Sequence, residues 1–92
     1  MIKIVRISSG DVIIGDCEAE NKALKIKNPV FIVPTEKGFV FVDMLNWFSD
    51  DKEVTISDSQ ILYQLNPASE LLDNYSQKIS GIALPSKSII GV

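Results

Sequence analysis

Side chains suited to acid–base, nucleophilic or metal chemistry are few in this sequence. The chain has no histidine, so the commonest general base is absent. Cys17 is the one thiol, and its place in a predicted strand points it inward, where a thiol is usually an unreactive apolar group. Asp50 and Asp51 are adjacent, but a hard cation needs several converging oxygens, so this pair is interpreted as a solvated turn. The sequence therefore predicts a protein that is not an enzyme and that uses no cofactor, metal or small-molecule substrate.

The charge balance argues against a general nucleic-acid binder. The chain has 9 Lys and Arg against 12 Asp and Glu, a formal net charge of -3. A protein that binds nucleic acid without preference needs many cations to displace counterions from the phosphates. The composition therefore leaves room only for a local basic patch.

Hydrophobic residues make up 46% of the 92 residues, a high share for so short a chain. Either the core is unusually rich or a partner covers apolar surface, and subunit association would explain the excess. A single cysteine cannot form an intrachain disulfide, which fits a reducing compartment. Charges interrupt the first apolar run, and no stretch approaches the roughly 20 apolar residues of a membrane span. We therefore expect a cytoplasmic protein without a signal peptide or a membrane contact.

Short β-branched runs between turn residues predict a mainly β region at 1–65, followed by a helix and tail at 66–92 that pack on the same domain. The expected strands are residues 2–7, 12–20 and 23–33, a fourth strand that starts at 39–42, is continued or bent by 43–48 and resumes at 53–56, and a last strand at 60–65.

The helix is expected to begin at Asn66 as N-cap, with Pro67 in the first helical position, and to close at Gly81. Its apolar stripe consists of Leu71, Leu72, Tyr75 and Ile79. The tail 82–92 is expected to add an edge strand or to form an extended arm.

The first long hairpin has a register that can be predicted. If Asn21 and Lys22 form its tip, one face carries the opposite-charge pairs Glu18–Lys25 and Asp16–Lys27. The other face is then apolar, with Cys17 opposite Ile26 and Ala19 opposite Leu24. A half-buried antiparallel pair needs this alternation, and a slip of one residue would destroy both faces.

The second hairpin has its tip near Glu36–Gly38, and its arms 30–33 and 39–42 are apolar on both faces. One face is expected on the core and the other on the helix or another subunit. A cluster of large apolar residues around the fourth strand has two open interpretations, core or association surface. It consists of Phe41, Met44, Trp47 and Phe48.

Gly10 precedes the second strand as a turn glycine, and Gly15 follows inside the strand, where a glycine marks sharp bending or close backbone approach. With this glycine spacing and this strand order, the chain resembles the Sm/LSm family, including its bacterial Hfq branch. Lys27–Asn28 falls where the first signature of that family ends its third strand. The resemblance implies a five-stranded, strongly bent antiparallel barrel that self-assembles, as a homo-oligomer, into a ring.

The chain departs from that family in several places. An acidic turn, Ser57–Gln60, replaces the family's basic turn, and Glu20–Lys22 is only the nearest equivalent of its usual Asp and Asn in the loop between strands two and three. The helix follows the barrel instead of preceding it, and the connection between strands three and four is long. In these features the chain looks like the short Sm-like proteins of marine bacteriophages, which would place it in a host cytoplasm.

The resemblance also implies where partners would bind. Single-stranded RNA would be held at a ring pore by the two turn segments, through Asn21, Lys22, Ser59 and Gln60. Neighbouring subunits would pair strand four with strand five, through Val54 and Ile56 on one side and Ile61 and Tyr63 on the other. The alternative is a homo-oligomeric protein–protein scaffold that has lost RNA binding.

Overall fold

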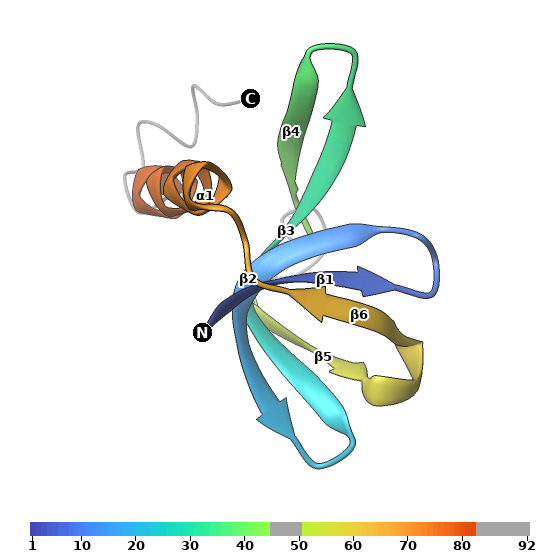
Figure 1. The fold of residues 1–92 in the computed structure, drawn as a ribbon. Helices are drawn as coiled ribbons and strands as arrows, with labels where there is room; N and C mark the ends of the chain where they lie inside the picture. Colours follow the sequence, from blue (N-terminus) through green and yellow to red (C-terminus); the bar gives the residue numbers. More distant parts are fainter. Residues whose placement is uncertain (45–50, 83–92) are drawn as a thin grey trace.

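The computed structural model describes residues 1–44 and 51–82, which form one antiparallel sheet and one C-terminal helix (Figure 1). The elements in chain order are β1 (Ile2–Ile7), β2 (Val12–Glu20), β3 (Ala23–Thr35), β4 (Gly38–Asp43), β5 (Glu53–Ser57), the short 3-10 turn η1 (Asp58–Gln60), β6 (Ile61–Leu65) and α1 (Ser69–Ile82).

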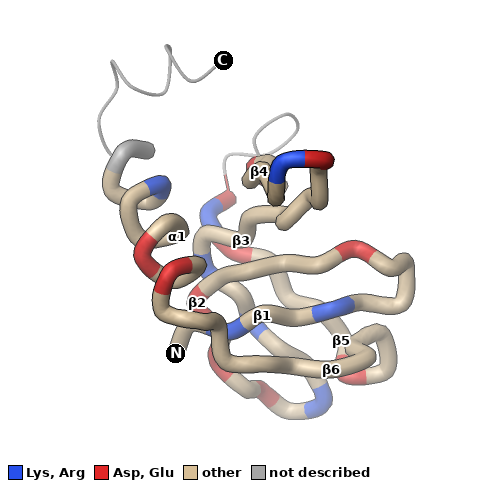
Figure 2. The backbone as a smooth tube through the Cα atoms, turned by 45° about the horizontal axis from the view of Figure 1, so that its top comes forward, with Lys and Arg blue, Asp and Glu red and all other residues tan. Residues whose placement is uncertain are grey.

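The sheet has six strands, in the order β4-β3-β2-β1-β6, with β5 paired to β3 beside that path. It has six strands instead of the expected five because the segment expected as one interrupted fourth strand forms two, β4 and β5, and the 13-residue β3 has room for both. The first half of β3 pairs with β5 and its second half with β4. Figures 1 and 2 show that the sheet curls until β5 and β6 lie near each other, joined by η1. Neither of these two strands has a second strand partner in the described part of the chain.

The β2–β3 hairpin has the predicted register, with Glu20 opposite Ala23 and Cys17 opposite Ile26. The charged residues are opposed as expected, but Asp16 forms its ion pair with the Met1 amino group, at 2.7 Å.

The register shifts between Ile14 and Asp16, so the intervening Gly15 marks the bend. A Cβ on Gly15 would lie 2.4 Å from the Ile26 side chain, which confirms the predicted close approach. Across the bend Asn28 has a left-handed backbone, with φ of 52°. Its N–H donates to the Lys52 carbonyl at 2.7 Å, and the bend is therefore tied to the segment that leads into β5.

The sheet is buried on both faces near its middle. Ile13 belongs to the inner core cluster, which also contains Val5, Cys17, Leu24 and Ile26. The next residue, Ile14, points to the opposite face and packs with Val30 and Tyr75 in the outer core cluster. Since α1 supplies Tyr75, the helix is what covers this second face.

Three of the four predicted stripe residues lie at the outer core cluster: Tyr75 belongs to it, and Leu71 and Ile79 pack against it. The fourth, Leu72, is half-buried but is not part of this packing. The predicted ends of the helix were wrong: α1 begins at Ser69 and runs through Gly81 to Ile82. Asn66 does not cap the helix, since its side chain instead accepts a hydrogen bond from the Lys3 ammonium at 2.7 Å.

The β3–β4 hairpin projects from the sheet beside α1 (Figure 1). Ile32 and Phe41 pack on the outer core cluster, whereas Val33, Val40 and Val42 are exposed on the other face. Met44 packs on the inner core cluster. The predictions for Trp47, Phe48 and the tail 83–92 lie outside the described residues.

Candidate functional site

The two turn segments predicted to bind RNA lie together. The amide of Asp58 in η1 donates to the carbonyl of Lys22 at 3.1 Å. The sheet register carries the contact further, because Ala23 pairs with Ser57. Lys22 itself has a left-handed backbone, with φ of 59°, as a tight two-residue turn requires. We call the exposed residues Asn21–Lys22 and Ser57–Gln60 the turn surface.

Two of the other predicted residues on the turn surface, Ser59 and Gln60, have partners in neighbouring turns. The Ser59 hydroxyl lies 3.0 Å from that of Ser57. The Gln60 carbonyl accepts from the Ser8 amide at 2.7 Å, and the Gln60 side chain bonds to the Ser8 hydroxyl. Ser59 and Gln60 are therefore oriented by neighbouring turns rather than free in solvent.

The turn surface is polar, with one cation in Lys22 and one carboxylate in Asp58. Charges of both signs also alternate over the rest of the chain (Figure 2), so the surface is not part of a wide basic field. It contains no aromatic side chain on which a base could stack. Chemically it can offer hydrogen bonds, one positive charge and one negative charge.

The residues predicted at the subunit interface occupy two different environments. Val54, Ile56 and Ile61 are half-buried and pack on the inner core cluster of their own chain. Tyr63 is 40% exposed. The exposed part of β5 and β6 is therefore mainly their backbone edges. The exposed apolar side chains next to these edges come from β6.

Two further exposed apolar residues on β6 were missed from the sequence. Leu62 is 60% exposed and Leu65 is 52% exposed. Leu62 is the extra residue of a β-bulge, because Ile61 pairs with Ile7 while Tyr63 pairs with Arg6. A bulge depends on the partner strand, so simple alternation along 60–65 could not reveal it.

Cys17 is buried in the inner core cluster, as predicted. Burial raises the pKa of its thiol, which keeps it protonated and unreactive. Among the described residues, no group of three or more Cys, Asp and Glu side chains converges as a metal site would require. Within the same residues, no helix is long and apolar enough to cross a bilayer.

A groove of about 630 Å³ between α1 and the β3–β4 hairpin was also missed from the sequence. Its walls come from residues 37–41 and 74–78, which are far apart in the chain and meet only because the outer core cluster holds the helix against the hairpin. The sequence predicted a hairpin tip and a helix surface at these residues, but no pattern in it indicated that the two lie side by side.

No protein-family model matches the chain, and no curated protein matches it.

Proposed function

We propose that this protein is a non-catalytic subunit of an Sm-like ring, in which β5 of one copy pairs with β6 of the next. The observation that carries this is that, among the described residues, β5 and β6, on either side of η1, each have one open edge; β4, at the other end of the sheet, has a third. Open edges expose unpaired backbone groups and invite uncontrolled association unless they are covered. Closed head-to-tail pairing would cover the β5 and β6 edges in every copy at once.

Side chains on β6 support this assembly. Leu62, Tyr63 and Leu65 are large, apolar and exposed in the single chain. Pairing of β6 with a neighbouring β5 would remove part of this surface from water, which is favourable. The long β3, the bend at Gly15 and the strand path from β5 through β3, β2 and β1 to β6 are also what the Sm resemblance leads us to expect.

Light scattering after size-exclusion chromatography tests the assembly. The ring should have a mass several times the 10.2 kDa of one chain. Leu62→Asp should release single chains, because an uncompensated charge buried in a paired interface costs roughly 3–5 kcal/mol. Leu62 is a better target than Ile61, whose side chain packs on the inner core cluster and whose replacement would also weaken folding.

Val40→Asp is the matched control. Val40 is 48% exposed on β4, outside the proposed interface, so this variant should keep the assembled mass. A wild-type chain that elutes as a 10.2 kDa monomer would contradict the ring. Equal dissociation of both variants would place the contact elsewhere.

Single-stranded RNA is the ligand we assign to the turn surface. Asn21 and Lys22 lie next to Ser59 and Gln60, and a ring would repeat this polar surface around its pore. Asp58 opposes phosphate binding, so we expect weak, salt-dependent affinity that rests on hydrogen bonds and on the repeated Lys22.

Binding of labelled U-rich and A-rich oligonucleotides at several salt concentrations tests this assignment. Lys22→Glu should weaken binding about tenfold or more, because each copy exchanges a cation for an anion. Lys27→Glu makes the same charge change away from the turn surface and should have a smaller effect. An intact ring that binds neither oligonucleotide would favour the protein scaffold instead.

A free thiol at Cys17 supports the reducing cytoplasm as the site of action.

A further inference from the structure

The groove between α1 and the β3–β4 hairpin has walls held at a fixed separation. The Tyr75 hydroxyl donates to the Asn28 carbonyl at 2.8 Å, which ties the helix to the sheet. The Lys78 ammonium lies 3.3 Å from Asp43 at the end of β4. The rings of Phe41 and Tyr75 also meet edge to face, with centroids 6.5 Å apart. These contacts hold the helix and the hairpin apart at the groove, and two of them are made by the lining residues Phe41 and Lys78.

Two phenylalanines form one wall of the groove. Phe39 and Phe41 lie edge to face, with centroids 5.2 Å apart and an angle of 61° between the rings. Phe41 is half-buried against the outer core cluster, so it is anchored. Phe39 is 40% exposed and therefore presents ring surface to whatever enters. An exposed ring that packs on an anchored neighbour is suited to stack on a planar aromatic ligand.

The polar part of the lining carries positive charge only. Lys37 comes from the hairpin tip and Lys78 from the helix, and none of the described residues that line the groove is a carboxylate. This contrasts with the chain as a whole, where acidic residues outnumber basic ones by 12 to 9. Asp43 reaches Lys78 from outside the lining. Because Asp43 offsets the charge of Lys78, the net positive charge of the lining comes from Lys37, and this charge favours an anion.

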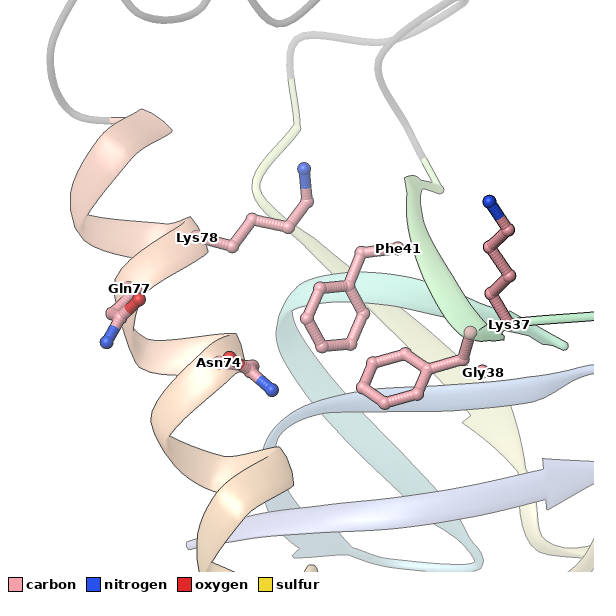
Figure 3. Close-up of a pocket in the computed structure, with 7 residues that line it drawn as sticks. Lys37, Gly38, Phe41, Asn74, Gln77 and Lys78 are labelled. Carbon is pink, nitrogen blue, oxygen red and sulfur yellow. The ribbon is translucent and has the colours of Figure 1, made fainter. Parts of the chain in front are cut away.

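Amide groups complete the opposite wall. Asn74 and Gln77 come from α1 and line the groove. Figure 3 shows the Asn74 amide directed from the helix toward the phenylalanine wall, and Lys78 extended across the top of the groove. An amide provides both donors and acceptors, which suits the polar edge of a nucleobase.

We propose that this groove binds a nucleotide, with the base against Phe39, the Asn74 amide at the base edge, and Lys37 and Lys78 at the phosphate. Stacking, amide recognition and cations in one groove match a ligand that is both aromatic and anionic. A free nucleotide and one unit of an RNA strand share this chemistry. The site is separate from the turn surface and does not require a ring.

Titration of the full chain with adenosine 5′-monophosphate, adenosine and a short oligoadenylate tests the proposal, with calorimetry or NMR shifts as readout. Adenosine should bind more weakly than its monophosphate because it lacks the anion. Phe39→Leu keeps an apolar side chain but removes the ring, and should weaken binding between about fivefold and a hundredfold. Lys37→Gln should weaken oligoadenylate binding and lower the slope of log affinity against log salt by about 0.7.

Asn74→Asp is the sharpest variant, because it preserves shape on an exposed helical position and adds the carboxylate that the groove lacks. It should weaken the monophosphate more than adenosine. Lys27→Gln makes a charge loss away from both the groove and the turn surface; it is the matched control and should leave monophosphate binding unchanged.

The outcomes separate the sources of the ligand. Monophosphate binding that is lost in Asn74→Asp supports a free-nucleotide site, whereas binding of oligoadenylate alone, lost in the same variant, supports a strand. Failure of all three probes to bind overturns the proposal, and so does binding that responds to Lys22→Gln on the turn surface but not to Asn74→Asp or Phe39→Leu. Two results together would refute the ring and support the groove: the wild-type chain is a monomer, and it binds the monophosphate whereas Asn74→Asp does not.

Discussion

Alkaline pH should weaken the contact between α1 and the sheet through the phenol of Tyr75. This side chain is 2% exposed, and its hydroxyl donates to the Asn28 carbonyl. Burial raises the pKa of Tyr75 from 10.0 to about 12. Below the unfolded pKa the phenol is neutral in both states, so its contribution to stability is complete. As pH rises from the unfolded toward the folded pKa, the unfolded chain loses its proton first and the free energy of unfolding falls.

The size of this loss follows from the shift of about 2 pKa units, each worth about 1.4 kcal/mol. The full loss of roughly 2.7 kcal/mol is reached only above the folded pKa, and about half of it, 1.4 kcal/mol, at about pH 11. Tyr75→Phe should lower stability near neutral pH by about 1 kcal/mol through the lost hydrogen bond. Because Tyr75→Phe has no phenol at this position, its free energy of unfolding should fall by about 1.4 kcal/mol less than that of the wild type between neutral pH and about pH 11.

Urea denaturation followed by circular dichroism, at neutral pH and at about pH 11, measures both quantities. Other groups also titrate in this range, so the difference between wild type and Tyr75→Phe is the relevant value. Tyr63→Phe, at an exposed position, should leave the alkaline loss in place and makes Tyr75 the sole tyrosine for absorbance titration. Equal alkaline losses in wild type and Tyr75→Phe would show that Tyr75 is not a buried acid.

Three further predictions concern the bend and the core. Gly15→Ala should destabilise the fold by about 1–3 kcal/mol, because the new Cβ would lie 2.4 Å from the Ile26 side chain; Glu18→Ala, exposed on the same strand, should change thermal stability by no more than about 0.5 kcal/mol. Asn28→Gly should be tolerated and Asn28→Val should cost about 1–2 kcal/mol in urea denaturation, since φ is 52° there; equal stability of the two variants would argue against a left-handed residue. The Cys17 thiol should react with a thiol reagent at a rate that follows global unfolding, because it is buried and burial raises its pKa; rapid labelling of the native protein would contradict this.

Features with a local cause could be predicted from the sequence. The register of the first hairpin follows from charge and apolar alternation, and it correctly placed Cys17 opposite Ile26. The helical stripe follows from spacing, and it correctly placed Tyr75 on the core. In both cases the deciding residues lie within one element or one hairpin. The turn surface is different, because it joins two segments that are far apart in the chain and its prediction came from the Sm resemblance.

Features that depend on distant partners could not be predicted. Nothing in the composition of β3 shows that its two halves pair with different strands. The helix start was misplaced because Asn66, a good cap by type, bonds to Lys3 instead. The groove depends on how closely α1 approaches the β3–β4 hairpin, which only the packed outer core cluster determines.

Asn28 lies at the pivot between the two halves of β3. Its amide is fastened to Lys52, and its carbonyl is fastened to Tyr75. Rotation of the β3–β4 hairpin about Asn28 would break a hydrogen bond to the helix or to the segment before β5. These two bonds therefore restrain the orientation of the hairpin. Asn28 does not line the groove, but its two hydrogen bonds help to set the distance between α1 and the β3–β4 hairpin.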